Sequence, residues 1–459
     1  MLKRHIFAVL FGICLLVLPV QAKYSGGTGT AEDPYQIANP SDLLLLAADT
    51  NDYNDCFILT DDVDLAGQIF TTTAIIAADT SPSGGFQGVA FTGTFDGNGY
   101  KITNFTINGE SNWFFGLFGY IASGGSVKNL GLENFSVSGY WFVGGLVGSN
   151  KGSISNCYST GTISGSQNSE CVGGLVGCND SSINNCYFTG VVSGSESVGG
   201  LAGDNYHGSI SNCYSTGVVS GDCCLVGGLV GSNNGGSINN CYSMGTVNGT
   251  SDCVGGLVGY NNSDYSNSSI SNCYSMGAVS GSSNVGGLVG YNGGSINNCY
   301  STGAVSGEYG VGGLVGFRYG GSIFNSFWDV NTSGTTDGVG NIDPDPNGVT
   351  GLPISQMQDI NTFTSAGWDF DYTDGNEADW FIQIDEYPIL VWQISPADIY
   401  TDGRNNFRDF AVFAEYWMRD DCAIYNAYCD WADLDFNGSV DIDDLIEFMN
   451  YWLESGIYN

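Results

Sequence analysis

The sequence predicts an all-β fold: a β-solenoid (β-helix) of about eight coils with N- and C-terminal caps, followed by a small α-helical domain. Eight copies of Gly-Leu-x-Gly recur at steps of 26 to 31 residues, a period typical of stacked supersecondary units. Glycine and serine clusters separate short β-rich runs, and glycine accepts the positive φ of sharp corners. Three short strands per copy therefore predict one solenoid coil. The copies begin at Gly116, Gly145, Gly174, Gly200, Gly228, Gly256, Gly287 and Gly313.

The first 22 residues have the pattern of a signal peptide. Lys3 and Arg4 form a positive start, and an apolar run up to Pro19 is followed by small residues ending at Ala22. We therefore expect a secreted, extracellular or cell-surface protein. No later apolar run reaches membrane length, so we expect no transmembrane segment in the mature chain.

Charge and composition divide the mature chain. The full sequence has 47 acidic and 10 basic residues, and two of the basic ones, Lys3 and Arg4, lie in the predicted signal peptide. This balance excludes nucleic acid as a partner because phosphates need a basic surface. The repeats hold few acids, whereas fourteen lie between Asp398 and Asn459, so a boundary is expected near Ser395. The predicted parts are an N-terminal cap with the first solenoid strands at 23–112, the repeat solenoid at 113–330, a C-terminal cap at 331–394 and a small domain at 395–459.

Asn-Cys-Tyr recurs once per copy and predicts two structural columns. An asparagine at one place in every coil can pass an amide hydrogen bond to the next coil, as in stacked β structures. In the opening copy, Leu130 and Leu132 occupy the places of Cys157 and Ser159, which indicates that the cysteines point inward as free thiols. The asparagines are Asn156, Asn185, Asn212, Asn240, Asn272 and Asn298, each directly followed by its cysteine.

The tyrosines of the same motif are then expected to face outward as an aromatic strip. Such a strip can stack on sugar rings and would make a polysaccharide-binding face. The alternative is that stacked aromatics protect the sheet and stabilise neighbouring coils, and it is favoured because no polar residue recurs beside the strip to orient a sugar. This possible ligand face consists of Tyr158, Tyr187, Tyr214, Tyr242, Tyr274 and Tyr300.

The Gly-Leu-Val-Gly copies with their Asn-Cys-Tyr segments resemble the GLUG-motif repeats of bacterial surface and secreted proteins. The resemblance extends over about Tyr24 to Trp392. It implies a β-solenoid and an extracellular location, but it implies no defined biochemical role.

Two acidic segments near the C-terminus match the frame of a calcium-binding loop. Calcium prefers oxygen ligands at loop positions 1, 3, 5, 7, 9 and 12, with glycine at position 6. Gly438 and Gly403 take position 6, and Tyr400 replaces the oxygen ligand at position 3 of the first loop. The predicted ligands of the second loop are Asp433, Asp435, Asn437, Ser439, Asp441 and Asp444. Those of the first are Asp398, Asp402, Arg404, Asn406 and Asp409, with Ser439 and Arg404 contributing backbone carbonyls.

An amphipathic helix is expected after each loop. Aspartate at position 12, and helices only after the loops, resemble a type I dockerin, whose two copies here begin 35 residues apart. This resemblance implies a cohesin-like partner recognised through loop positions 10 and 11. Those are Phe407-Arg408 and Ile442-Asp443, unlike the Ser-Thr pair of many cellulosomal dockerins, which puts a cellulosomal partner in doubt. Cys422 and Cys429 lie between the copies and are expected to form a disulfide in an oxidising exterior.

The sequence favours a non-catalytic role. His207 is the one histidine after the predicted leader, no nucleophile motif surrounds it, and no phosphate loop or zinc spacing occurs. We therefore expect a secreted or cell-surface scaffold or adhesion protein with a calcium-dependent module for protein attachment. The alternative is a polysaccharide-binding or polysaccharide-degrading component (glycoside hydrolase or lyase) of an extracellular complex, because proteins that carry dockerins are often such enzymes.

Overall fold

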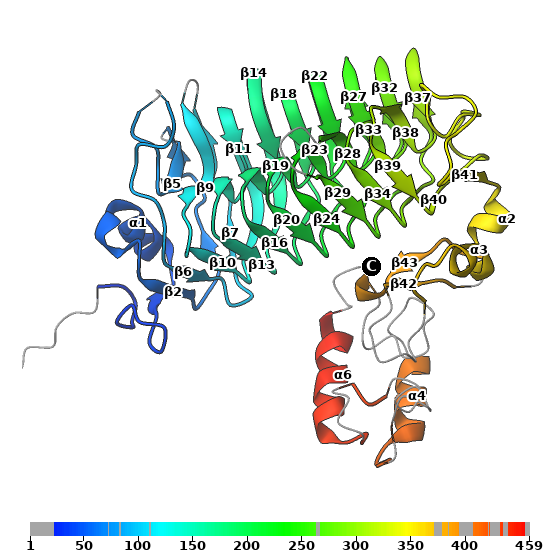
Figure 1. Cartoon of the computed structure of the whole chain (residues 1–459). Helices are drawn as coiled ribbons and strands as arrows, with labels where there is room; N and C mark the ends of the chain where they lie inside the picture. The colour runs from blue at the N-terminus through cyan, green and yellow to red at the C-terminus, as the bar shows by residue number, and fades with distance from the viewer. Residues whose placement is uncertain are drawn as a thin grey trace, which may run out of the picture.

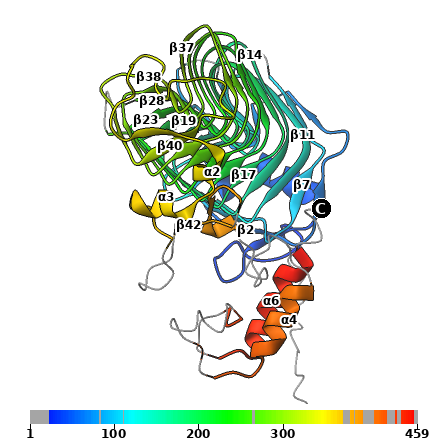
Figure 2. The ribbon, with the colours of Figure 1, turned by 90° about the vertical axis from the view of Figure 1, so that its right-hand side faces the viewer.

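The computed structural model describes residues 23–71, 73–81, 84–109, 112–262, 267–370, 379–383, 385–393, 407–420, 422, 432–434 and 439–454. The predicted signal peptide, at 1–22, lies outside these residues. The chain folds into an all-β parallel solenoid with few helices, as the sequence predicts (Figure 1). Figure 2 looks along the rod and shows the coils stacked behind one another around one elongated core.

Three parallel sheets run along the rod, and we name them sheets A, B and C. Residues at the same place in successive coils are direct neighbours; Ile210, for example, pairs with Ile183 on one side and Ile238 on the other. Sheet A has eleven strands, so the N-terminal segment adds coils before the first repeat. They are β1 (Tyr35–Ile37), β2 (Cys56–Leu59), β6 (Thr94–Asp96), β10 (Ser126–Lys128), β13 (Ser153–Ser155), β16 (Ser182–Asn184), β20 (Ser209–Ser211), β24 (Ser237–Asn239), β29 (Ser269–Ser271), β34 (Ser295–Asn297) and β39 (Ser322–Phe324).

Sheet B carries the tyrosines and the following segment of each coil. Its strands are β3 (Val63–Asp64), β4 (Ile69–Phe70), β7 (Lys101–Thr103), β8 (Thr106–Asn108), β11 (Gly131–Val143), β14 (Tyr158–Gly173), β17 (Tyr187–Phe188), β18 (Val191–Gly199), β21 (Tyr214–Ser215), β22 (Val218–Gly227), β25 (Tyr242–Ser243), β26 (Val247–Gly249), β27 (Asp252–Gly255), β30 (Tyr274–Ser275), β31 (Val279–Ser280), β32 (Ser283–Gly286), β35 (Tyr300–Ser301), β36 (Val305–Ser306), β37 (Tyr309–Gly312), β40 (Ser326–Asp329) and β41 (Val349–Leu352).

Sheet C contains the end of each Gly-Leu-x-Gly motif. Its strands are β5 (Ala74–Ile76), β9 (Trp113–Ile121), which also pairs with sheet B, β12 (Val147–Asn150), β15 (Val176–Asn179), β19 (Ala202–Tyr206), β23 (Val230–Asn234), β28 (Val258–Asn262), β33 (Val289–Asn292) and β38 (Val315–Arg318). The motif leucines are fully buried in the core, as Leu201 and Leu229 illustrate. The second glycine of the motif is needed because its backbone lies against the backbone of the preceding coil. A Cβ on Gly231 would lie 2.5 Å from the carbonyl carbon of Ser197, one coil earlier.

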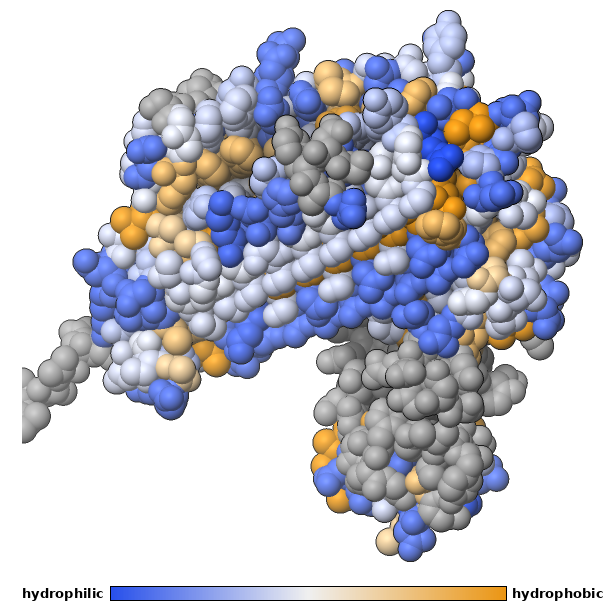
Figure 3. All heavy atoms as spheres, in the orientation of Figure 1, coloured by the Kyte–Doolittle hydropathy of each residue, from blue (hydrophilic) through white to orange (hydrophobic). Residues whose placement is uncertain are grey.

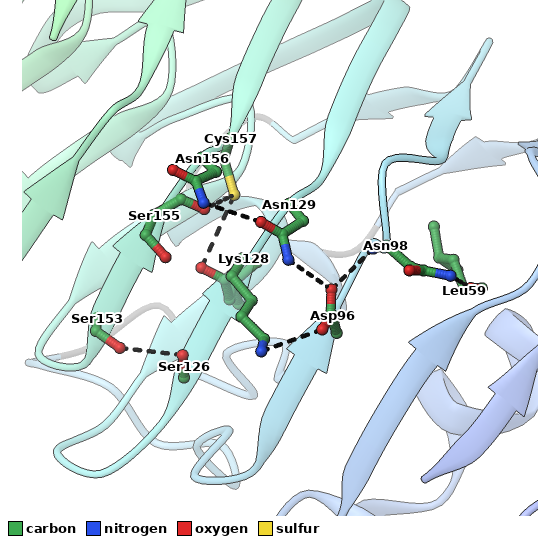
Figure 4. Close-up of polar contacts among 11 residues, drawn as sticks. Leu59, Asp96, Asn98, Ser126, Lys128, Asn129, Ser153, Ser155, Asn156 and Cys157 are labelled. Carbon is green, nitrogen blue, oxygen red and sulfur yellow. Dashed lines mark hydrogen bonds and ion pairs between the residues drawn. The ribbon is translucent and has the colours of Figure 1, made fainter. Parts of the chain in front are cut away.

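The Asn-Cys-Tyr asparagines form the corner between sheets A and B, and this corrects the predicted reason for their recurrence. Each has a positive φ, 52° at Asn156 and 50° at Asn298, a left-handed conformation that asparagine tolerates better than most residues. Side-chain hydrogen bonds of the expected kind join Asn185 to Asn156 (3.2 Å) and Asn156 to Asn129 (3.0 Å). The Asn129 amide in turn donates to the Asp96 carboxylate, as Figure 4 shows. Further along, the side chains of Asn240 and Asn272 bond instead to Asp379.

A different column, at the end of sheet C, forms the continuous amide ladder. Six asparagines lie five residues after the first glycine of their Gly-Leu-x-Gly copies, and all are fully buried. The Nδ2 of each of the first five donates to the Oδ1 of the asparagine in the next coil at 2.8–2.9 Å. Ile121 and Arg318 occupy the register places at its two ends. We call this column the asparagine ladder: Asn150, Asn179, Asn205, Asn233, Asn261 and Asn292.

The cysteines of the Asn-Cys-Tyr motif point into the core, as predicted. All six are free and at most 1% exposed: Cys157, Cys186, Cys213, Cys241, Cys273 and Cys299. The backbone N–H of Cys157 lies 3.4 Å from the Sγ of Cys186, and the contact repeats in the next coils. Burial raises the pKa of the thiols of Cys157, Cys186 and Cys213 well above the usual range, so these side chains stay neutral and unreactive.

We expect a thiol-alkylating reagent to distinguish the buried and exposed cysteines in the reduced, folded chain. Cys223 is exposed, with its Sγ 3.0 Å from that of Cys224, and should be modified rapidly. The six motif cysteines should be modified only after unfolding, because the reagent cannot reach them. Mass spectrometry of digested protein measures each site, and Cys223→Ser is the control that removes the fast site. Equal labelling of the motif cysteines in the native chain would contradict their inward direction.

Both ends of the solenoid are covered. At the N-terminal end lies α1 (Pro40–Ala48), whose first turn is capped by the Asn39 side chain, which accepts from the N–H groups of Ser41 and Asp42. A 3-10 turn, η1 (Thr50–Asp52), follows it. After β41, α2 (Ile354–Met357), α3 (Ile360–Ser365), β42 (Trp380–Phe381), β43 (Ile389–Leu390) and η2 (Val391–Gln393) form a compact segment. We call residues 353–393 the aromatic flap.

Two amphipathic helices form the rest of the described chain, α4 (Phe407–Tyr416) and α6 (Ile442–Glu454). They have a core of their own that includes Phe413, Val440 and Phe448. Among the described residues, no helix combines the length and apolar character needed to cross a bilayer.

Candidate functional site

The two C-terminal helices pack against each other through equivalent residues of the two sequence copies. Phe413 of α4 and Phe448 of α6 stack with ring centroids 5.0 Å apart and planes 26° apart. These residues are 35 positions apart, the spacing that separates Asp398 from Asp433. Equivalent residues of the two copies therefore face each other across one small core.

Three predicted calcium ligands are fully buried: Asp409, Asp433 and Asp444. The Asp444 carboxylate accepts from the N–H of Leu434 (2.6 Å) and of Asp441 (2.8 Å), so loop position 12 folds back over positions 2 and 9. Burial of a carboxylate is costly unless hydrogen bonds or a cation compensate its charge. Carboxylate oxygens are ligands that calcium prefers.

The other predicted ligands are only partly observed. Ser439 and Asp441 are half-buried within the second loop. Within the part of the chain that the structure describes, no three acidic, histidine or cysteine side chains converge as a metal site. The remaining predicted ligands lie outside that part: Asp398, Asp402, Arg404, Asn406, Asp435 and Asn437.

Cys422 belongs to the small core of the C-terminal helices and is disulfide-bonded. Its predicted partner, Cys429, lies outside the described residues, so the pairing stays a prediction.

The tyrosine column is a continuous stack on the outer face of sheet B. Ring centroids of successive coils are 4.7–5.0 Å apart, and the planes differ by 1–10°. Five stacking contacts in series stabilise the coils against one another, which agrees with the structural interpretation of the column. The stack runs through Tyr158, Tyr187, Tyr214, Tyr242, Tyr274 and Tyr300.

The aromatic flap covers half of this column, which corrects the predicted ligand face. Tyr242, Tyr274 and Tyr300 are 8%, 1% and 0% exposed. The Tyr274 hydroxyl contacts Gln393 Oε1 at 3.0 Å, and Tyr300 donates to the Pro388 carbonyl at 2.5 Å. Only Tyr158, Tyr187 and Tyr214 of the column remain half-exposed. The sequence signal for this cover was the concentration of tryptophan in 353–393: Trp368, Trp380 and Trp392.

A shallow groove of about 360 Å³ crosses the corners that join sheet C to sheet A. Its sides include Ser182, Ser209 and Ser237, which are register neighbours at the start of β16, β20 and β24. His207 and Asn267 complete it. Small and hydrophilic side chains run in rows along this face in Figure 3. His207 is exposed. The groove around it is formed by residues of neighbouring coils, so no local motif in the sequence marks it.

Comparison with known proteins identifies the repeats. The family model described as the GLUG motif matches residues 139–164, 168–193, 194–220, 222–248, 250–280 and 281–306. Halomucin of Haloquadratum walsbyi is 34% identical over 146 residues, which are 30% of this chain and 2% of that protein. A protein of Evansella cellulosilytica, provisionally named a Gly-rich membrane protein, is 35% identical over 143 residues, 29% of this chain and 15% of its own length.

One solved structure resembles the fold. It is a crystal structure of a provisionally assigned immunoglobulin A1 protease from Bacteroides ovatus, 22% identical, with a TM-score of 0.46. The match covers 81% of this chain and 96% of that one. The chain therefore carries GLUG-motif repeats, and it spans only small parts of the curated relatives that it matches.

Proposed function

We propose that this chain is an exported, non-catalytic β-solenoid scaffold that attaches to a partner protein through a calcium-dependent, dockerin-like C-terminal module. The observation that carries the proposal is the burial of Asp409, Asp433 and Asp444 beside a two-fold helix core. Calcium would neutralise these carboxylates and hold each loop against its helix. The solenoid would then act as a rigid spacer.

The calcium ligands are those of the two loop frames. The second loop supplies oxygens from Asp433, Asp435, Asn437, Asp441 and Asp444 and the carbonyl of Ser439. The first supplies oxygens from Asp398, Asp402, Asn406 and Asp409 and the carbonyl of Arg404. Tyr400 leaves this first loop one oxygen short, so it binds calcium more weakly.

The docking partner is a cohesin-like protein, which binds the residues at loop positions 10 and 11. Ile442 at position 10 of the second loop is 58% exposed, and Asp443 beside it is exposed as well. An exposed apolar side chain at the start of a helix gives a partner an anchor. Support for a secreted or surface location comes from the leader pattern at 1–22 and from a relative named as a membrane protein.

Calorimetric titration of the full mature chain with calcium tests the module. We expect saturable heat, and we expect Asp433→Asn to weaken binding at the second loop by at least about tenfold, because one charged ligand is lost. The matched control is Asp443→Asn, an exposed acid on α6 outside the ligand positions, which should bind like the wild type. Absence of heat, or equal affinity of the two variants, would refute the calcium module.

Polysaccharide binding is the second candidate function. The half-exposed part of the tyrosine column at Tyr158 and Tyr187 favours it, because a sugar chain can lie along the outer edges of these rings. A binding component would be retained by polysaccharide without releasing sugars. Release of reducing sugar or unsaturated product from a polysaccharide panel would instead identify an enzyme.

A further inference from the structure

We infer that the groove around His207 binds a short segment of neutral polysaccharide. This inference rests on the second candidate function and adds a place for it, away from the tyrosine column. The groove crosses three coils, and hydroxyl groups of Ser182, Ser209 and Ser237 repeat along it at the spacing of stacked strands, about 4.8 Å.

The groove exists because glycine is required at its floor. The asparagine ladder lies directly beneath the corners between sheets C and A. A Cβ on Gly208 would lie 2.3 Å from the Nδ2 of Asn179, and one on Gly236 would lie 2.2 Å from the Nδ2 of Asn205. No side chain can therefore fill these corners, and the backbone remains open to a ligand.

Asn267 and Ser268, the two residues before β29, border the groove on one side. Asn267 lines the groove. Ser268 is fixed to the groove floor, because its Oγ accepts from the N–H of Gly235 at 2.7 Å.

The chemistry of the lining selects the ligand class. Among the residues that the structure describes here, the lining side chains are serine hydroxyls, an asparagine amide and the His207 imidazole, without a lysine, arginine, aspartate or glutamate. Phosphate groups and nucleic acid would need cations there. An apolar ligand or peptide anchor would need an apolar pocket. Hydroxyl and amide groups instead match the donors and acceptors of uncharged sugars.

An aromatic face stands beside the polar lining. Tyr206 is 40% exposed, and its ring centroid lies 4.4 Å from that of His207 at an interplanar angle of 64°. Tyr206 does not itself line the groove, but a sugar chain that extends past His207 would meet this ring while its hydroxyls contact the serines. This combination of one aromatic surface with convergent polar groups is typical of small-molecule sites.

Affinity gel electrophoresis of the full mature chain tests the inference. The gels contain dissolved β-glucan, xylan, galactomannan or dextran, with polygalacturonate as the acidic comparison. We expect at least one neutral polymer to retard the wild-type chain. His207→Ala should weaken binding about fivefold, as expected for a lost hydrogen bond and ring contact, and Ser209→Trp should abolish it by filling the groove.

Ser322→Trp is the matched control, because Ser322 holds the same register place at the far end of sheet A. It should be retarded like the wild type. If Ser209→Trp does not fold, His207→Ala and Asn267→Ala, both at exposed positions, decide the question. Retardation that survives the groove variants would overturn the groove but leave polysaccharide binding intact. Retardation by polygalacturonate alone would likewise overturn the inference about neutral polymers, and no retardation by any of the polymers would overturn polysaccharide binding as well.

Discussion

Replacing Asn233 by alanine is expected to destabilise the solenoid by about 4 kcal/mol. Asn233 is fully buried, accepts from Asn205, and donates to Asn261 and to the carbonyl of Gly236. Its loss removes three buried hydrogen bonds, at about 0.5–1.5 kcal/mol each, and leaves the buried Oδ1 of Asn261 unpaired, at about 1–3 kcal/mol. Denaturant unfolding followed by circular dichroism measures the loss in free energy of unfolding.

Asn184→Ala is the matched control for the ladder. Asn184 lies at the end of β16, is half-buried, and donates to the Ser211 hydroxyl at 2.7 Å. Solvent can replace this partner, so the expected change is about 0.5 kcal/mol. Similar losses for the two variants would show that the ladder contributes no more than an ordinary surface amide.

Replacing Trp380 by alanine is expected to detach the aromatic flap, with a loss of about 3–5 kcal/mol in the free energy of its docking. Trp380 is fully buried, and its ring lies 4.5 Å from Trp368 and 6.0 Å from Tyr300. Because the flap covers Tyr274 and Tyr300, its release should expose these rings. Limited proteolysis within 353–393 should become rapid while the repeat region stays resistant.

Phe324→Ala provides the comparison for this variant. Phe324 is 56% exposed on sheet A, and its removal should change neither stability nor proteolysis measurably. A Trp380→Ala chain with wild-type proteolysis would contradict the docking of the flap on the tyrosine column.

The repeat was sufficient to predict the solenoid, because every coil contains the same Gly-Leu-x-Gly motif and the same short β-rich runs. The period predicted the parallel stacking, and Leu130 and Leu132 predicted the inward direction of the cysteines. Strict alternation of side chains between the two faces of a strand would have placed the cysteines outside. The departure from alternation has a backbone cause: the asparagine before each cysteine has a positive φ and turns the chain. Asparagine suits this corner by its own conformational preference, so its recurrence there did not require a side-chain ladder.

The asparagine ladder is visible in the sequence as a regular column, but its hydrogen bonding is not. Its members stand five residues after the first glycine of each repeat copy, from Asn150 to Asn292, as regular as the motif itself. Burial decides which asparagine column must bond continuously, and burial depends on the cross-section of the coil. The sequence period does not contain that information.

The covering of the tyrosines was beyond local reasoning. Trp392 donates to the carbonyl of Asn240, 152 residues away in sequence, and its ring lies 5.7 Å from Tyr242. No period or spacing predicts which coils such a segment will reach. The groove around His207 likewise arises from neighbouring coils.

The calcium-dependent module is the central claim, and differential scanning calorimetry of the full mature chain tests it most directly. Calcium at about 100 times its dissociation constant should stabilise the module by about 2.7 kcal/mol and leave the solenoid unchanged. We predict that, relative to a chelator, calcium raises the temperature of one unfolding transition, the one absent from a chain ending at Gln393. Identical thermograms with calcium and with chelator would contradict the account.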